Sequence, residues 1–127
     1  MAINQDQEDA QELAASVRAA LVGTGAIREV RMFGGIGFML NGNLVAAASR
    51  RGLLLRVGKD RQAKALAQSG ARPMVMRGRT MEGYVYVDPP ALNKLAIQDR
   101  LRLAVAYVQT LPRKADRKAT QRKGKQT

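Results

Sequence analysis

The sequence predicts a two-layer α+β domain in which helices pack on an antiparallel sheet of about five strands, formed by a meander and a hairpin. Three observations lead to this fold class. Apolar residues recur at helical spacing near both ends of the chain. Short strand-like runs lie between them, and Asn41-Gly42, the strongest short-range signal of a hairpin, separates two of these runs. A second hairpin pattern follows a short helical run, so the expected order is α-β-β-β-β-α-β-β-α.

The first expected element is an amphipathic helix in residues 6–23. Its apolar residues form a single stripe at helical spacing: Ala10, Leu13, Ala14, Val17 and Leu21. Acidic residues crowd its first turns, where the helix dipole favours negative charge. Gly23 or Gly25 can end the helix in a left-handed conformation.

Residues 26–57 are expected to form the meander. The runs IREVRMF, GFML and NLVAAAS are short, and Asn41-Gly42 joins the last two because both residues tolerate positive φ. A second turn, SRRG, leads to LLLRV. We expect three or four antiparallel strands in this segment.

A short helix is expected next, in residues 59–70, with Ala63, Leu66 and Ala67 facing inward. The runs MVM and GYVYV then flank a polar turn in residues 71–88. This pattern predicts the second hairpin.

A long final helix is expected to cover about residues 91–111. Pro89 and Pro90 end the preceding strand and open this helix, since Pro is tolerated in a first turn, and Asp88 is expected to cap it. The helix is apolar over so wide an arc that it should touch the sheet plus another helix or another subunit. Arg100 projects within this arc, either as a snorkelling side chain at its rim or as an interfacial or ligand-holding residue.

Residues 113–127 differ from the rest of the chain in composition. They hold seven Lys or Arg residues and one Asp, a net charge of +6 out of +12 for the whole chain. They contain no apolar residue larger than Ala, so they cannot bury enough surface to become ordered. We therefore expect a folded domain in residues 1–112 followed by a flexible basic tail.

Two missing residue types limit the chemistry that the chain can perform. It contains no Cys and no His, which removes the thiol nucleophile, the usual general base near neutral pH and nearly every zinc or copper site. We expect no metal and no cofactor. The polar, acidic N-terminus is unlike a signal peptide, and no apolar run is long enough to span a membrane. A cytoplasmic protein without membrane contact is expected.

The glycines in MFGGIGFMLNG allow two interpretations. A phosphate-binding loop places its glycines between a strand and a helix, whereas glycines inside strand-like sequence mark a bulge, a bend or a close backbone approach. The run Gly34-Gly35-Ile36-Gly37 lacks the dinucleotide and Walker spacings, and another strand-like run follows it. We expect these glycines to bend a strand.

Two sequence blocks resemble the N-terminal domain of the TfoX/Sxy family: MFGGIGFMLNGNLVAAAS followed by GLLLRV, and RPMVM followed by MEGYVYVDP. The resemblance covers about residues 10–111 and implies a fold similar to the secretion-chaperone type. It assigns structural roles to Met32, Phe33, Gly34, Gly35, Gly37, Gly83 and Tyr84, beside the Asn41-Gly42 turn. The best-known members regulate competence genes in bacteria and carry a further helical C-terminal domain, which we expect this chain to lack.

The sequence allows three functions. The first is that of a non-enzymatic regulatory or adaptor domain, which acts through contacts with an unidentified protein. The last helix supports this function and could also form a homodimer. Met74, Met76 and Met81 support it if they face outward, because Met adapts to binding surfaces; the alternative is that they fill the core.

The second function is non-specific binding of DNA or RNA, because clustered cations attract phosphates. The candidate residues lie in the hairpins and in the tail: Arg50, Arg51, Arg77, Arg79, Arg113, Lys114, Arg117, Lys118, Arg122, Lys123 and Lys125. Arg56 and Arg72 can extend this basic surface.

The third function is catalysis by carboxylates near the sheet. Glu29, Asp60, Glu82 and Asp88 are candidates, with Tyr84 and Tyr86 as hydroxyl partners. Glu29 stands among arginines and is most simply a surface ion pair. We expect no enzymatic activity.

Overall fold

The computed structural model describes residues 5–32, 34–89 and 92–114, and it confirms the predicted α+β class. The elements follow the predicted order: α1 (Gln5–Ala20), β1 (Ile27–Met32), β2 (Gly35–Leu40), β3 (Asn43–Ser49), β4 (Gly52–Arg56), α2 (Lys59–Leu66), β5 (Ala71–Met76), β6 (Arg79–Val87) and α3 (Lys94–Val108). The sheet has six strands where about five were expected. The meander contributes four of them because the charged run IREVRM also pairs as a complete strand.

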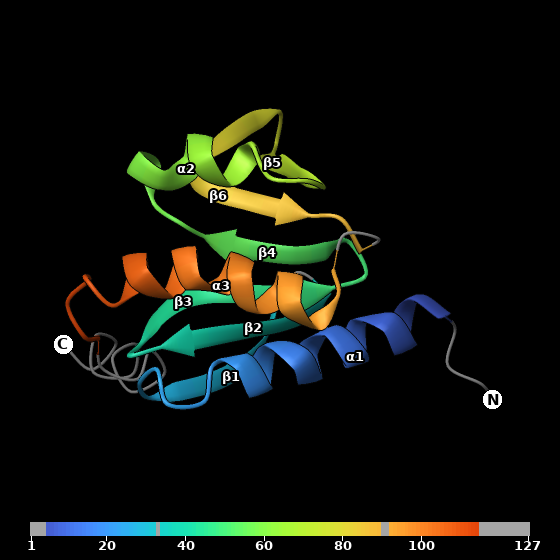
Figure 1. The fold of residues 1–127 in the computed structure, drawn as a ribbon, viewed down its shortest axis with the longest axis horizontal. Helices are drawn as coiled ribbons and strands as arrows, with labels where there is room; N and C mark the ends of the chain where they lie inside the picture. Colours follow the sequence, from blue (N-terminus) through green and yellow to red (C-terminus); the bar gives the residue numbers. More distant parts are fainter. Residues whose placement is uncertain (1–4, 33, 90–91, 115–127) are drawn as a thin grey trace, which may run out of the picture.

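All neighbouring strands are antiparallel, in the spatial order β1-β2-β3-β4-β6-β5. The first four strands follow one another across the sheet, as Figure 1 shows. α2 follows β4 along the chain and leads to β5, which forms the far edge of the sheet. β6 then lies between β5 and β4.

The helices contribute to one core on a single face of the sheet. α1 and α3 lie side by side in front of the strands in Figure 1. Four of the five residues of the predicted stripe, Leu13, Ala14, Val17 and Leu21, are buried in this core, and Ala10 is partly buried. The core continues through buried residues of the other helices and of the strands: Phe38, Leu40, Ala46, Ala48, Leu53, Leu55, Ala65, Val85, Val87, Ile97, Leu101, Ala104 and Val108.

α3 begins later than predicted, because its cap is Asn93. The Asn93 side-chain oxygen accepts a hydrogen bond from the Ala96 backbone N–H at 2.8 Å, which satisfies a donor in the first turn. The prediction that Pro89-Pro90 opens the helix is therefore wrong. The predicted cap is also wrong: the Asp88 carboxylate accepts from Arg72 Nε at 2.7 Å.

The orientation of α2 also differs from the prediction. Ala65 is buried and Leu66 is half-buried, whereas Ala63 and Ala67, which were expected to face inward, are exposed. A helix of eight residues has only about two turns, so its short apolar pattern did not determine the buried side.

The broad apolar arc of α3 is occupied within the chain. Its buried residues face the sheet, and Leu103, Val105 and Tyr107 pack half-buried against the same core. α3 contacts β3, β4, α1 and α2, which agrees with the predicted option of the sheet plus another helix. A homodimer through this helix stays a prediction. In the described part of the chain, no helix is long and apolar enough to cross a membrane.

Candidate interaction surface

The face of the sheet opposite the helices carries its own apolar cluster. Alternate residues of a strand point to opposite faces, so Ala47 and Leu54 point away from the helix-covered core to which Ala46, Ala48, Leu53 and Leu55 belong. Residues in register form a row across all six strands: Val30, Gly37, Ala47, Leu54, Tyr86 and Arg72. We call this side of the sheet the open face.

Long side chains of the strands shield the open face in place of helices. Ala47, Leu54, Met74 and Tyr86 form a buried cluster, and Met81 and Tyr84 pack against it: each of these six residues belongs to a strand. No described residue of a helix joins this cluster. Leu54 is nevertheless only 1% exposed, so neighbouring side chains close over it.

Arg72 covers Tyr86. Its guanidinium carbon lies 4.7 Å from the centre of the Tyr86 ring, within the range of a cation–π interaction. Arg72 Nε donates to Asp88, and Nη2 donates to the Arg51 carbonyl oxygen at 3.1 Å. These contacts hold the arginine across the edge of the cluster.

Arg56 lies between two further tyrosines. Its guanidinium carbon is 5.9 Å from the centre of the Tyr84 ring and 5.7 Å from that of Tyr107. Tyr84 belongs to β6 and Tyr107 to α3. The open face therefore combines methionine, tyrosine and arginine side chains, the residue types enriched at protein interfaces.

The three methionines that were expected to face a partner or fill the core divide between these roles. Met74 is buried in the open-face cluster and Met81 is half-buried against it, whereas Met76 is 36% exposed. Val75, its neighbour, is 58% exposed. β5 therefore ends in two exposed apolar residues that follow the buried Met74, and we call these two residues the exposed apolar edge.

The β5–β6 hairpin extends beyond the rest of the sheet. Pairing between β4 and β6 ends at Arg56–Tyr84, and all residues in 75–80 are exposed. Arg77 occupies the left-handed region with φ 54° in the turn, a conformation that L-residues adopt uncommonly. The predicted Arg77 and Arg79 therefore lie at a projecting tip.

The predicted hairpin arginines do not form one patch. Arg50 and Arg51 lie in the β3–β4 turn, at the end of the sheet where Leu53 pairs with Val87 and β6 finishes. The tip with Arg77 and Arg79 lies where β6 begins, at the opposite end.

The chain at the start of the predicted tail is attached to the β2–β3 turn through Pro112 and Lys114. Lys114 N–H donates to the Asn41 carbonyl oxygen at 2.9 Å, and buried Asn43 donates through Nδ2 to the Pro112 carbonyl oxygen at 3.0 Å. A small cavity of about 170 Å³ beside this attachment is lined partly by Arg28, Arg113 and Lys114. The remaining tail candidates lie outside the described residues: Arg117, Lys118, Arg122, Lys123 and Lys125.

The glycine block forms a hairpin rather than an anion-binding loop. Gly34 has φ 73° and connects β1 to β2, and Phe38 lies within β2 and not at a helix start. A Cβ on Gly35 would overlap the Ala48 carbonyl oxygen, and a Cβ on Gly37 would lie 2.5 Å from Met32 Sδ. The backbone therefore approaches its neighbours closely at Gly35 and Gly37, as expected. The chain changes direction at Gly34, however, in a turn between β1 and β2 and not in a bend within one strand. Phe33 lies outside the described residues.

The other motif positions also have structural roles. Asn41 and Gly42 have φ 53° and 85° and form the predicted hairpin turn. Gly83 has φ 85°, and its carbonyl oxygen accepts from the backbone N–H groups of Val57 and Gly58. These two bonds fix the exit from β4 toward α2, next to Tyr84.

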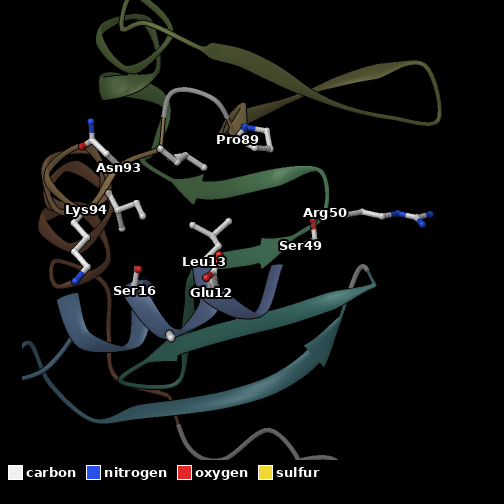
Figure 2. A pocket seen from close by; sticks show the side chains of 11 residues that line it. Glu12, Leu13, Ser16, Ser49, Arg50, Pro89, Asn93 and Lys94 are labelled. Atoms are coloured by element: carbon white, nitrogen blue, oxygen red, sulfur yellow. The ribbon is translucent and has the colours of Figure 1, made fainter. Parts of the chain in front are cut away.

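A groove of about 830 Å³ separates α1 from the start of α3. Figure 2 shows Glu12 and Ser16 on α1, Ser49 at the end of β3 and Lys94 on α3, while the Arg50 side chain extends away from the groove. Its serines have no adjacent histidine base, since the chain contains no His. The arrangement therefore lacks the Ser–His pair of serine hydrolases.

Three of the four predicted acidic candidates belong to separate ion pairs, and the fourth, Asp60, lies in the first turn of α2. Glu29 accepts two hydrogen bonds from Arg18, at 2.5 and 2.9 Å, and this hydrogen bonding lowers the Glu29 pKa below its ordinary value. Glu82 lies 3.8 Å from Lys59, and Asp88 pairs with Arg72. Within the described residues, no three acidic side chains gather as a metal site.

Arg100 is more buried than a snorkelling residue. Its side chain is 13% exposed, and Nη2 donates to the Ser69 carbonyl oxygen at 3.2 Å. Nη1 lies 3.7 Å from Asp99, whereas Nε has no hydrogen-bond partner among the described residues. Arg100 thus ties α3 to the segment that follows α2.

The described domain is similar to a known protein family. The family model of the TfoX N-terminal domain matches residues 19–107. This range begins at the end of α1, includes all six strands and α2, and ends within α3. No curated protein and no solved structure matches the chain.

Proposed function

The chain belongs to the TfoX N-terminal domain family, and from this premise we propose that it is a non-enzymatic regulatory or adaptor domain that acts through protein contacts. The observation that carries the proposal is the open face, where a Met- and Tyr-containing cluster is shielded by strand side chains alone. The exposed apolar edge at Val75 and Met76, which follows the buried Met74 along β5, offers apolar area to a partner.

The chemistry of the open face suits a protein partner. Methionine side chains adapt to different partner shapes, and tyrosine and arginine contribute strongly to binding energy at interfaces. A partner that contacts Val75 and Met76 can extend over Met81 and Tyr84 because these half-buried side chains belong to the adjoining β6. The proposed contact is therefore centred on the β5–β6 side of the open face.

Affinity capture from nuclease-treated lysate tests this function, followed by binding measurements with the purified partner. The test variant is V75E/M76E, which places charge on the exposed apolar edge. The matched control is L95E, because Leu95 is 77% exposed on α3, in the helix layer. We expect the wild type and L95E to bind the same protein and V75E/M76E to lose it.

Two results would overturn the proposal. One is equal binding of that partner by V75E/M76E and L95E. The other is loss of every captured partner after nuclease treatment, which would favour nucleic-acid binding. Thermal melts of all three proteins separate loss of the surface from loss of the fold.

Nucleic-acid binding is the second candidate, and the attachment of Lys114 favours it. The hydrogen bond to Asn41 places Lys114 near Arg28 and Arg113, where the three cations share one small cavity. The tail thus leaves the domain from an already basic site. The arginines of the β5–β6 tip offer a separate contact.

The salt dependence of DNA binding tests this candidate. Truncation after Lys114 retains the Lys114–Asn41 hydrogen bond and removes only residues 115–127. We expect it to abolish most affinity and to reduce the log–log salt slope by about 0.9 for each phosphate that the protein no longer neutralises. Unchanged binding by the truncated protein would exclude this segment as the binding site.

A further inference from the structure

β1 is an edge strand of the described sheet, and its pairing with β2 is regular, without a bulge. Each of its six residues pairs one-to-one with β2. Among the described strands, none pairs with its other edge. Such an edge presents a row of N–H and C=O groups that another chain can bind.

The backbone direction in β1 follows from one hydrogen bond. Asn41 N–H donates to the Ala26 carbonyl oxygen, and antiparallel pairs alternate between bonded and non-bonded positions. The backbone N–H and C=O groups of Arg28 and Val30 therefore bond to β2. Those of Glu29 and Arg31 point away from β2, toward the unpaired edge of the sheet.

The opposite edge of the sheet is built differently. β5 contains Pro73, which has no backbone N–H, and its register with β6 shifts between Pro73 and Val75. Proline and bulges are devices that prevent edge-to-edge pairing. β1 has neither, so the two edges are not equivalent.

We propose that β1 pairs antiparallel with β1 of a second copy about a two-fold axis at Val30, so that the two sheets become continuous. This register places Glu29 of each copy opposite Arg31 of the other, twice in the dimer. Each of these pairs exchanges two backbone hydrogen bonds through groups that already point outward. Val30 faces Val30, and Arg28 faces Met32.

The charges select this register over its neighbours. Two residues directly opposite each other must both direct their backbone N–H and C=O groups toward the partner strand, or both direct them away from it. An axis between two residues would place residues of opposite kinds against each other, so the axis can pass only through a residue. An axis at Arg28 or Arg31 places two arginines face to face, and one at Glu29 places two glutamates face to face. Like charges directly opposite are destabilising. Of these four registers, only the axis at Val30 avoids them.

A residue of the helix layer, Arg18, already fixes the position of the Glu29 carboxylate, which is one partner of each Glu29–Arg31 ion pair. Glu29 is held by Arg18 of α1, so its carboxylate lies on the helix side of the sheet. Arg31 follows two residues later and therefore lies on the same side. In the dimer, the partner copy's arginine approaches a carboxylate whose position is already fixed.

Charge exchange tests the proposal by sedimentation. R31E leaves each Glu29 facing a like charge and should weaken the dimer about tenfold or more, since two cross-strand pairs change from attractive to repulsive. The triple variant R18E/E29R/R31E restores opposite charges in the pairs between the copies and in the pair of residues 18 and 29 within each copy, and it should recover most of the affinity. L95E on α3 should leave the dimer unchanged.

Amide hydrogen exchange supplies a local measurement. In the wild type at concentrations where the dimer dominates, the amides of Glu29 and Arg31 should exchange slowly, and in R31E they should exchange fast. A monomeric wild type at all concentrations would overturn the proposal. So would a dimer that R31E does not weaken, one that the triple variant fails to restore, or one that L95E dissociates instead.

Discussion

Replacing Gly35 by Ala should destabilise the domain far more than replacing Gly37 by Ala, although both residues lie in β2. Gly35 has no positive φ, so the effect arises from space. Its added Cβ would overlap the Ala48 carbonyl oxygen and lie 2.8 Å from Ser49 Cβ. Backbone atoms cannot rotate away, so β2 and β3 must separate at this end.

The loss of unfolding free energy follows from the backbone hydrogen bonds and the packing that the separation of β2 and β3 disrupts. Loss of one or two backbone hydrogen bonds costs about 0.5–1.5 kcal/mol each, and overpacking adds about 1–3 kcal/mol. The lower entropy of the unfolded chain with Ala returns about 0.4–1 kcal/mol. We expect a net loss of about 2–4 kcal/mol and a fall in Tm of about 10–20 °C.

Gly37 is the matched control, because the atoms nearest to its added Cβ belong to the Met32 side chain, with Sδ at 2.5 Å. That flexible side chain can change rotamer, so the loss should stay within about 1 kcal/mol. Urea unfolding followed by circular dichroism gives both values. Equal stability of the wild type and G35A, or equal losses in both variants, would refute this reasoning.

Three further predictions concern local contacts. N93A should cost about 1 kcal/mol in urea unfolding because the N-cap bond to Ala96 is lost; a variant as stable as the wild type would show that another group caps α3. Because hydrogen bonding to Arg18 lowers the Glu29 pKa from its ordinary 4.5, the stability that it contributes is present at neutral pH and is lost as pH falls through the lower folded-state value. The difference between wild type and E29Q should therefore vanish in acid, and a constant difference across pH would contradict this linkage. N43A should accelerate hydrogen exchange at the Lys114 amide, since Asn43 holds Pro112 in place; unchanged exchange would mean that the Asn41 contact alone suffices.

The sequence predicted the elements whose signals are local. The stripe from Leu13 to Leu21 and the Asn41-Gly42 turn need no tertiary information, and both are present. The start of α3 was missed because two prolines and Asp88 gave a plausible helix opening. Asn93 is an equally good cap, and the contact of Asp88 with Arg72 requires two strands to be paired before it can form.

The open face could not be predicted from the pattern of apolar residues. Leu53 and Leu54 are adjacent and both almost completely buried, yet they belong to different clusters. A run such as LLLRV shows that both faces of a strand are buried but not what covers each one. The placement of Arg77 and Arg50 at opposite ends likewise depends on the direction of β6, which only the sheet order determines.

The cover over Tyr86 has a kinetic consequence. A helix that shields a core can leave only if its hydrogen bonds or its connections break, whereas the Arg72 side chain can swing aside by rotation about single bonds. Side-chain rotations of exposed groups take picoseconds to nanoseconds, many orders of magnitude faster than local unfolding. Removal of the arginine from the Tyr86 ring therefore breaks only contacts of the Arg72 side chain, with Tyr86, Asp88 and the Arg51 carbonyl oxygen, and requires no rearrangement of the backbone.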